Sequence, residues 1–255
     1  GILSARKAEV PVISVGNVTA GGTGKTPFVA WLSRFLLILN YSPAVLSRGY
    51  GGNDEVDDEN DLLREAIGEA PVVVNPDRVE GARQAVEEHG ADVLVMDDGF
   101  QHRRLDRDVD IVLVDALMPL GGGHLLPRAY LREPLEELSR ADLLVLTRTD
   151  LVPAERVEEI KERLAEYAPD VPVARAVHSP VGLQDIGVPG EEGSRSLDEL
   201  KLGEWGAFCG IGNPEAFERT LVRHGCDVRF TEVFPDHHSY TREDVQMVVE
   251  RARQA

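Results

Sequence analysis

A glycine-rich segment between an apolar run and a helix-like stretch constrains the fold of this chain most strongly. Residues 12–15 have the composition of a buried strand, residues 16–24 that of a loop, and a helix is expected to begin at Lys25 and Thr26. Glycines allow backbone N–H groups to turn toward phosphate oxygens, and a helix N-terminus adds the positive end of its dipole. The sequence therefore predicts a loop that binds the phosphates of a nucleoside triphosphate, at Gly21-Gly22-Thr23-Gly24-Lys25-Thr26-Pro27.

Two residues of this loop have expected roles. Lys25 should reach the β- and γ-phosphates, and the hydroxyl of Thr26 should bind Mg²⁺. The segment departs from the GxxxxGK[ST] pattern, because Thr19 stands where the first glycine is usual. The glycines at 21, 22 and 24 still supply the necessary backbone freedom. The alternative interpretation is a glycine-rich turn that happens to precede a helix.

The rest of the chain alternates short apolar runs with helix-like stretches. Runs rich in Val, Ile and Leu are typical of strands buried on both faces of a sheet. They occupy residues 10–15, 44–46, 72–74, 93–96, 111–114 and 143–146, and helices are expected at residues 26–39, 77–88, 154–167, 215–224 and 242–253. This alternation predicts an α/β fold of the P-loop NTPase type, with a mostly parallel sheet flanked by helices.

Three stretches interrupt the alternation. Residues 50–61 are predicted to be an exposed loop, residues 121–134 a long functional loop, and residues 182–196 a linker or surface excursion. A change of subdomain is expected near residue 180, and the part of the chain after it is shorter and less regular. The expected division is a nucleotide-binding kinase core over residues 1–180 and a smaller C-terminal lobe over residues 181–255 that completes the site.

Two adjacent carboxylates follow the apolar run at residues 93–96. An acid at the carboxyl end of such a strand is the arrangement that holds Mg²⁺ beside a phosphate loop. Asp97 and Asp98 repel each other unless a cation lies nearby, so one or both are predicted to bind the metal. An Asp-Asp-Gly turn without a metal is the alternative.

Composition excludes several classes of protein. The formal net charge of −18 argues against a general nucleic-acid binder, which needs a basic face. Cys209 and Cys226 are the only cysteines and lack CxxC spacing, so neither a disulfide framework nor a thiolate zinc site is expected. No apolar run approaches the length of a membrane span, and no signal peptide is visible. The chain on these grounds is expected to be soluble.

Several segments, in one order along the chain, together resemble the tetraacyldisaccharide 4′-kinase family, the lipid A 4′-kinases of Gram-negative envelope synthesis. They are residues 12–17 (VISVGN), 21–27 (GGTGKTP), 46–51 (LSRGYG), 75–79 (NPDRV), 97–104 (DDGFQHRR), 126–127 (LP), 131–135 (LREPL), 210–214 (GIGNP) and 234–238 (FPDHH). The acidic run at 97–104 is particularly specific. The resemblance implies transfer of the ATP γ-phosphate, with Mg²⁺, to the 4′-hydroxyl of a tetraacylated glucosamine disaccharide 1-phosphate.

The resemblance also implies a location and a catalytic pair. The enzyme would act at the cytoplasmic face of the inner membrane, with attachment expected through an N-terminal segment missing from this chain. A catalytic Asp in a Val-Gly-Asp-Glu segment falls on Asp58, although Asp57 replaces the glycine and the preceding loop is short, so Asp54 and Asp61 remain rivals. The catalytic His falls on His237, with His238 as its rival. We expect Asp58 to accept the proton of the sugar hydroxyl, supported by His237.

Substrate-binding residues are expected in loops near the carboxyl ends of the strands, where open α/β sheets bind ligands. Arginine matches phosphate geometry, and the acceptor carries a 1-phosphate. The candidates are Arg48, Arg78, Gln101, Arg103, Arg128 and Arg132. Surface ion pairs are the alternative for each arginine. Apolar residues at 117–120 and 125–126 could contact acyl chains or simply pack beneath a loop.

Three rival functions can be formulated. Leu146-Thr-Arg-Thr-Asp150 loosely resembles a guanine-reading [NT]KxD motif, which would suit a GTPase-type switch or assembly factor, but Arg148 replaces the lysine. A nucleotide-binding module without catalysis would bind ATP and transfer nothing. A small-molecule kinase or ligase with a similar loop fits the segment 121–134 and the order of motifs less well.

Overall fold

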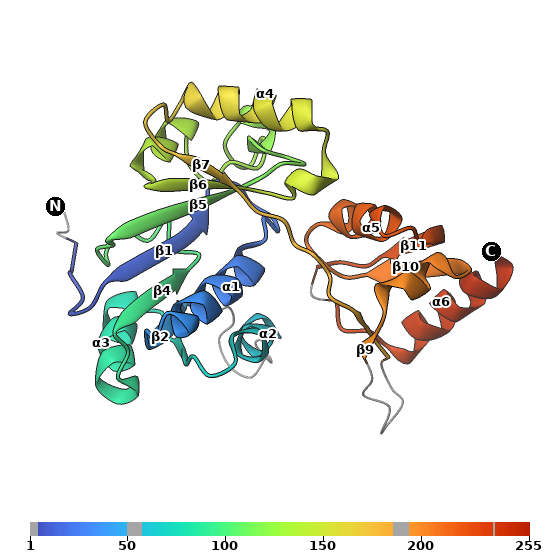
Figure 1. The fold of residues 1–255 in the computed structure, drawn as a ribbon, viewed down its shortest axis with the longest axis horizontal. Helices are drawn as coiled ribbons and strands as arrows, with labels where there is room; N and C mark the ends of the chain where they lie inside the picture. The colour runs from blue at the N-terminus through green and yellow to red at the C-terminus, as the bar shows by residue number, and fades with distance from the viewer. Residues whose placement is uncertain (1–4, 50–57, 186–193, 237) are drawn as a thin grey trace. The chain divides into compact units, whose positions relative to one another are not determined.

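A computed structural model describes residues 5–49, 58–185, 194–236 and 238–255 of the chain (Figure 1). The chain divides into two compact units, Gly1–Ala176 and Val177–Ala255. The predicted roles of a kinase core and a completing lobe remain predictions.

The first unit is built on a seven-stranded sheet in which every pairing is parallel. The strand order is β3-β2-β4-β1-β5-β6-β7. The strands are β1 (Val12–Asn17), β2 (Pro43–Ser47), β3 (Val72–Val74), β4 (Val93–Asp97), β5 (Val109–Asp115), β6 (Leu143–Thr147) and β7 (Val173–Arg175). The predicted α/β class with a mostly parallel sheet is confirmed. Because β1 lies between β4 and β5, the loops after these strands meet at one edge of the sheet.

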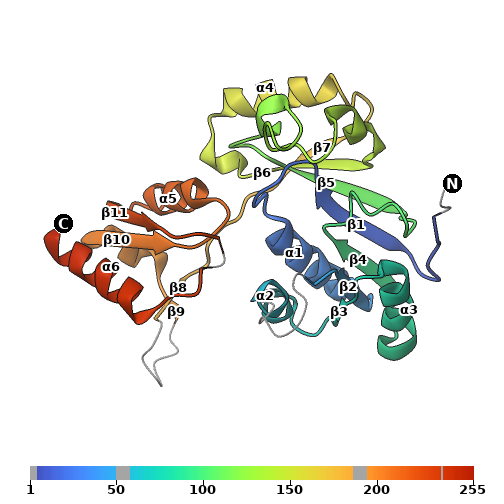
Figure 2. The ribbon, with the colours of Figure 1, turned by 180° about the vertical axis from the view of Figure 1, so that it is seen from behind.

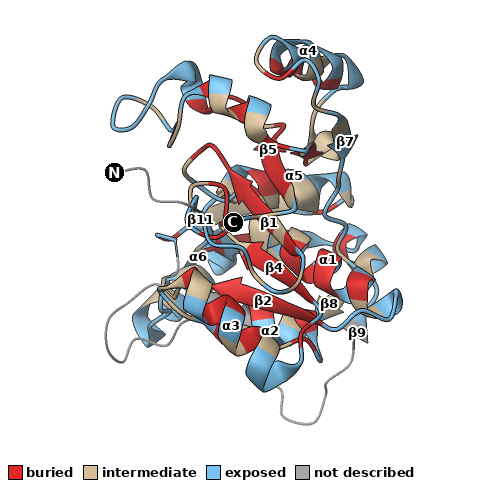
Figure 3. Cartoon of the chain, turned by 90° about the vertical axis from the view of Figure 1, so that its left-hand side faces the viewer, coloured by how far each residue is buried: buried red, intermediate tan, exposed pale blue. Residues whose placement is uncertain are grey.

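Helices cover both faces of this sheet. Successive side chains along each strand point to opposite faces, so they join different buried apolar clusters. The helices α1 (Lys25–Ile38) and α2 (Asp58–Ile67) pack on one face with Val15, Val95 and Val145. The helix α3 (Arg78–His89) packs on the opposite face over β2, β3 and β4. Figure 2 shows the same elements from behind, and Figure 3 shows the central strands as mostly buried.

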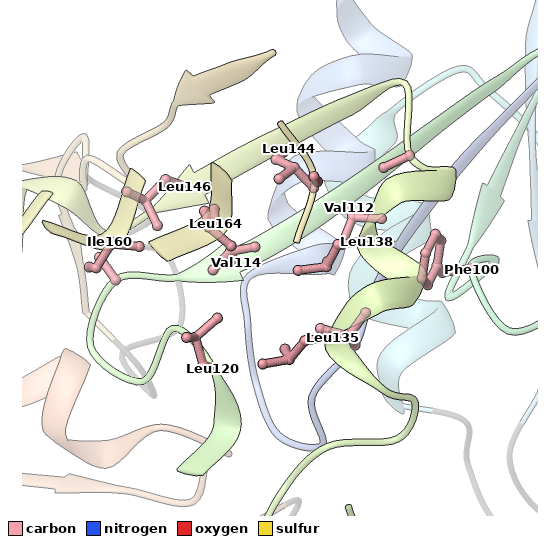
Figure 4. Close-up of a cluster of buried hydrophobic side chains, with 14 of the residues drawn as sticks. Phe100, Val112, Val114, Leu120, Leu135, Leu138, Leu144, Leu146, Ile160 and Leu164 are labelled. Atoms are coloured by element: carbon pink, nitrogen blue, oxygen red, sulfur yellow. The ribbon is translucent and has the colours of Figure 1, made fainter. Parts of the chain in front are cut away.

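A further cluster buries the other half of the second face, beneath α4 (Ala154–Ala165) and a short 3-10 helix (Leu135–Arg140). Figure 4 shows its large side chains, which include Phe100 beside Leu138 and Val112. Phe100 is fully buried and follows the Asp97-Asp98-Gly99 segment directly. The cluster therefore fixes the end of that acidic segment to the core.

Phe100 packs directly against Gly16 of β1, and it can do so because glycine has no side chain. A Cβ atom on Gly16 would lie 2.5 Å from Cβ of Phe100 and 2.6 Å from its backbone nitrogen. We expect Gly16→Ala to lower the free energy of unfolding by about 3 kcal/mol, because a buried strand and a buried backbone would have to separate. Urea unfolding of the two proteins measures this. A change within about 0.5 kcal/mol would show that the strand and the segment adjust freely.

Among the described residues of the second unit, the structure has two small sheets and two α-helices. The strands β10 (Glu204–Cys209) and β11 (Asp227–Val233) pair in parallel, and β8 (Leu183–Gln184) pairs antiparallel with β9 (Ser194–Arg195). The helices are α5 (Pro214–Arg223) and α6 (Arg242–Gln254). Phe208, Phe234 and Tyr240 form an aromatic cluster against which His238 also packs.

Two sequence expectations need correction. Residues 50–61 were expected to be a loop, but α2 already begins at Asp58. Four acidic residues among 57–61 favour the first turn of a helix, where the dipole is positive, so acidity alone does not indicate a loop. The strands β7, β10 and β11 were not predicted, because half-exposed residues interrupt their apolar pattern.

In the described part of the chain, no helix has the length and apolar character needed to cross a bilayer.

Candidate active site

The predicted phosphate loop connects β1 to α1, as the sequence indicated. Gly21 and Gly24 adopt φ values of 105° and 88°, a region that favours glycine over any residue with a side chain. Gly24 caps α1, and Lys25 is the first residue of that helix. The N–H groups of the first helical turn have no partners within the helix, so they and the dipole favour an anion at this end.

Lys25 lies between two polar side chains. Its Nζ atom is 3.2 Å from Oδ1 of Asn17, which is buried, and 3.5 Å from Oδ1 of Asp98. Asn17 ends β1 and Asp98 follows β4, so neighbouring parallel strands supply the two oxygens. The loop lysine and the acidic segment, predicted separately from sequence, therefore meet in the structure.

Asp98 also forms an ion pair with Arg132, whose Nη1 atom lies 3.0 Å and 2.9 Å from the two carboxylate oxygens. Burial by itself would raise the pKa of Asp98, but the charges of Lys25 and Arg132 outweigh it and hold the pKa below its ordinary value of 3.8. Asp98 has a backbone φ of 50°, which few non-glycine residues adopt. Such backbone strain is common at functional sites.

The segment 121–134 delivers Arg132 by pairing with the phosphate loop. The backbone of Ala20 donates to the carbonyl of Tyr130 at 2.7 Å, and Arg132 donates to the carbonyl of Val18 at 2.7 Å. Between them, Leu131 is buried and forms a bridge with Thr19. Thr19, which departs from the usual glycine pattern, thus belongs to an extended contact between the two loops.

Other predicted residues are placed differently. Arg78 is buried and donates from Nη2 to the backbone carbonyl of Asp97 at 2.8 Å, and Gln101 donates from Nε2 to the carbonyl of Asn17 at 2.9 Å. Both therefore contact the backbone of the site. Arg48 and Arg103 are exposed, and Nη1 of Arg103 lies 3.9 Å from Oε2 of Glu137.

On the segment 121–134, Leu125, Leu126, Arg128 and Tyr130 are also exposed. Met118, which precedes this segment, is exposed as well. Leu120 is buried in the core beneath them. The apolar residues proposed for acyl chains are therefore divided between core packing and the surface.

The predicted catalytic pair falls on residues that the structure describes incompletely or not at all. His237 and Asp54 lie outside the described residues. Asp58 and Asp61 are placed by their backbone, at the first residue and in the first turn of α2. The rival His238 is described: it stacks on Phe234 and its Nε2 atom lies 2.9 Å from Asp244.

The oxygen donors near the loop suit Mg²⁺. Thr26, Asp97 and Asp98 would offer a hydroxyl and carboxylates, which are hard oxygen ligands. Among the residues that the structure describes, no group of three or more His, Cys, Asp or Glu gathers to hold a metal. Mg²⁺ is commonly held by one or two carboxylates together with phosphates and water, which is a set of ligands that these side chains can supply.

The sequence reasoning missed three supporting residues. Asn17 was read only as part of a motif, and Thr147 only as part of a guanine-reading pattern. The hydroxyl of Thr147 donates to the carbonyl of Thr23 at 3.0 Å, which braces the phosphate loop from β6. Arg107 donates to the carbonyls of Gly99 and Phe100, which supports the acidic segment. The partner of Thr147 is distant in sequence, whereas Asn17 and Arg107 contact residues two to eight positions away. Such contacts depend on how the loops fold, and no periodic pattern in the sequence reveals them.

Comparison with known proteins decides the family. The family model described as "Tetraacyldisaccharide-1-P 4'-kinase", LpxK, matches residues 1–255. This chain belongs to that family. The tetraacyldisaccharide 4′-kinase of Halothermothrix orenii is 40% identical over 273 residues, which cover 97% of this chain and 71% of the relative. That of Syntrophus aciditrophicus is 42% identical over 278 residues, covering 98% and 73%.

A solved structure of a family member agrees with the fold. The crystal structure of LpxK from Aquifex aeolicus in complex with ATP has a TM-score of 0.72 and 32% sequence identity, over 95% of this chain and 76% of that one. The GTPase-type alternative is not favoured. The segment that suggested it instead provides structural contacts, since Thr147 braces the phosphate loop and Arg148 pairs with Asp115.

The lowered pKa of Asp98 predicts a pH dependence of stability. Because the pKa is depressed in the folded state, the ion pairs of Asp98 contribute fully above pH 3.8, and the contribution is lost as pH falls through the folded-state pKa. We expect the difference in unfolding free energy between wild type and Asp98→Asn to be constant from about pH 5 to about pH 8 and to shrink below that range. Urea unfolding at several pH values tests this. A difference that grows on acidification would contradict the assignment.

Proposed function

We propose that this chain transfers the γ-phosphate of Mg·ATP to the 4′-hydroxyl of a tetraacylated glucosamine disaccharide 1-phosphate. The observation that supports the proposal most strongly is the meeting of Lys25, Asp98 and Arg132 beside the phosphate loop of a chain in this family. Two cations and one carboxylate beside a phosphate loop would suit the transfer of a phosphoryl group with several negative oxygens.

Each residue of the site has a role that follows from its charge and position. The backbone of residues 21–26 would surround the phosphates at the N-terminus of α1, and Lys25 would offset charge on the β- and γ-oxygens. Arg132 carries a planar guanidinium that can bind two oxygens of a phosphate. Its present ion pair with Asp98 holds it within the site before any anion is bound.

Magnesium would be held by Thr26 together with Asp97 or Asp98, and when bound it would neutralise charge on the phosphate oxygens. The carboxylates can hold the metal only if the acidic segment that carries them is itself fixed. Arg107 donates a hydrogen bond to the carbonyl of Gly99, and Phe100 is buried in the core, so both hold the acidic segment in place. Gln101 connects the segment to the end of β1 through its hydrogen bond to the carbonyl of Asn17. Replacing each acid by asparagine distinguishes Asp97 from Asp98 as the metal ligand.

A base must remove the proton of the acceptor hydroxyl. We assign this to Asp58, which begins α2, with His237 as its supporting residue. The assignment rests on the resemblance of residues 56–59 and 234–238 to the family's segments. Arg48, Arg78, Gln101, Arg103 and Arg132 are proposed to position the anionic acceptor and the phosphates. Because the acceptor carries four acyl chains, its reaction is proposed to occur at the cytoplasmic face of the inner membrane.

The test is phosphate transfer in detergent micelles. The protein would be incubated with Mg·ATP labelled at the γ-phosphate and with the tetraacyldisaccharide 1-phosphate, and lipid and nucleotide would be separated. Label in the lipid supports the proposal. Nucleotide hydrolysis without label in the lipid would contradict it, and such hydrolysis with selectivity for GTP over ATP would favour the GTPase-type alternative.

A further inference from the structure

Asn17 occupies an unusual place, because one buried side chain contacts three parts of the phosphate loop. It ends β1 and has no exposed surface. Its Nδ2 atom donates to the carbonyl of Thr19 at 2.7 Å and to the hydroxyl of Thr23 at 3.0 Å. Its Oδ1 atom accepts from Nζ of Lys25 at 3.2 Å. The start of the loop, its end and its lysine are therefore connected through one amide.

The partners define which way the amide points. Nitrogen faces a carbonyl oxygen and a hydroxyl, and oxygen faces an ammonium group. The reversed amide would set nitrogen against the ammonium of Lys25 and oxygen against the carbonyl of Thr19, so only one orientation satisfies both. A carboxylate lacks the two donors, and a hydroxyl cannot offer two donors and an acceptor at this span.

The backbone of Asn17 extends the connection to the acidic segment. Its carbonyl accepts from Nε2 of Gln101 at 2.9 Å, three residues after Asp98. Lys25 is in turn 3.5 Å from Asp98, and its side chain is only 15% exposed. The ammonium is therefore held from both sides, by the Asn17 amide and by the Asp98 carboxylate.

We propose that Asn17 is a positioning residue for Lys25. Its amide holds the ammonium above the loop and fixes the loop in the shape that receives the phosphates. An unrestrained lysine would have to lose rotational freedom when the nucleotide binds, whereas here that ordering exists beforehand. This inference rests on the proposed transfer reaction, because it assigns Asn17 to the same site.

The first test compares Asn17→Leu with wild type. Leucine has the same number of side-chain heavy atoms and the same branching but offers no polar contact. We expect KM for ATP to rise about 10-fold and kcat to fall about 10-fold, with KM for the lipid unchanged. Thr147→Val is the matched control, because it removes a buried hydrogen bond to Thr23 of the same loop without touching Lys25. It should raise KM for ATP by about threefold and leave kcat within about twofold.

The second test reads the lysine directly. The chain has four lysines, Lys7, Lys25, Lys161 and Lys201. After reductive ¹³C-methylation, each gives its own NMR signal, and Lys25→Arg identifies that of Lys25. We expect Asn17→Leu to move the Lys25 signal toward that of a free side chain and Thr147→Val to leave it in place. Asn17→Asp, which retains an acceptor for the ammonium, should leave Lys25 ordered yet raise KM for ATP. It serves as the second variant if Asn17→Leu does not fold.

The outcomes separate this inference from the proposed function. One outcome overturns the role of Asn17 alone. In it, the wild type transfers phosphate, and the Lys25 signal is the same in Asn17→Leu, Asn17→Asp and Thr147→Val. Equal kinetic effects of Asn17→Leu and Thr147→Val would also overturn it, since both would then act only on the loop. If wild type transfers no phosphate but the Lys25 signal still moves in Asn17→Leu alone, the proposed function fails and the positioning contact stands.

Discussion

Replacing Lys25 with alanine is expected to lower kcat for phosphate transfer by about 10³-fold or more. Lys25 is the one cation of the phosphate loop, and it is held at the N-terminus of α1 between Asn17 and Asp98. Its charge opposes the negative charge on the β- and γ-oxygens in the transition state, and preorganised charges of this kind commonly contribute 10²- to 10³-fold each. The measurement is kcat with saturating Mg·ATP and lipid.

The control for Lys25→Ala is Lys161→Ala. Lys161 lies on the surface of α4, where it pairs with Glu158, and its loss should leave kcat unchanged. Lys25→Arg keeps the charge but changes the geometry, so it should recover only part of the rate. A Lys25→Ala protein that is folded and retains more than about one tenth of the wild-type kcat would contradict the role assigned to the loop.

Asp98→Asn should have the second-largest effect, a fall of about 10²-fold or more in kcat. Asparagine preserves size but removes the charge that pairs with both Lys25 and Arg132. A neutral amide is also a weaker ligand for Mg²⁺ than a carboxylate, so the Mg²⁺ concentration for half-maximal rate should rise. The measurement is kcat as a function of Mg²⁺ at saturating ATP, for Asp98→Asn and Asp97→Asn in parallel.

The parallel variant distinguishes the two acids. If Asp98 is the ligand, Asp97→Asn should change the Mg²⁺ requirement less than Asp98→Asn does. Asp106→Asn, an exposed change beyond the same segment, provides a control for nonspecific effects. An unchanged Mg²⁺ requirement in Asp98→Asn together with an increased one in Asp97→Asn would move the metal to Asp97, and no change in either would remove both from the metal site.

The central sheet could be predicted from sequence because its strands are buried on both faces. Continuous runs of Val, Ile and Leu then replace the alternation of half-exposed strands, and β1, β2, β4, β5 and β6 show this pattern. The strand β10 mixes exposed, half-buried and buried residues, and β11 has exposed and half-buried residues alone, so their apolar pattern is weak. The central strands could therefore be predicted because both of their faces are buried, more than because of the strand propensity of their residues.

The parts of the site that could be predicted are those carried by local sequence. A glycine-rich loop before a helix indicates Lys25 and Thr26, and acids at the end of a strand indicate Asp97 and Asp98. Arg132 was selected by its place in a loop, but its ion pair with Asp98 depends on pairing between residues 121–134 and the phosphate loop. The contact of Thr147 joins β6 to the phosphate loop, and that of Asn17 depends on how the loop folds back on the end of β1, so no periodic pattern encodes either.

The most direct test of the central claim is where the phosphate goes. Wild type and Lys25→Ala would be given Mg·ATP labelled at the γ-phosphate with two acceptors, the tetraacyldisaccharide 1-phosphate and the same lipid lacking its 4′-hydroxyl. We predict labelled lipid only from wild type acting on the acceptor with a free 4′-hydroxyl. Equal label in both acceptors, or equal label from both proteins, would contradict a phosphate-loop kinase that acts at this position.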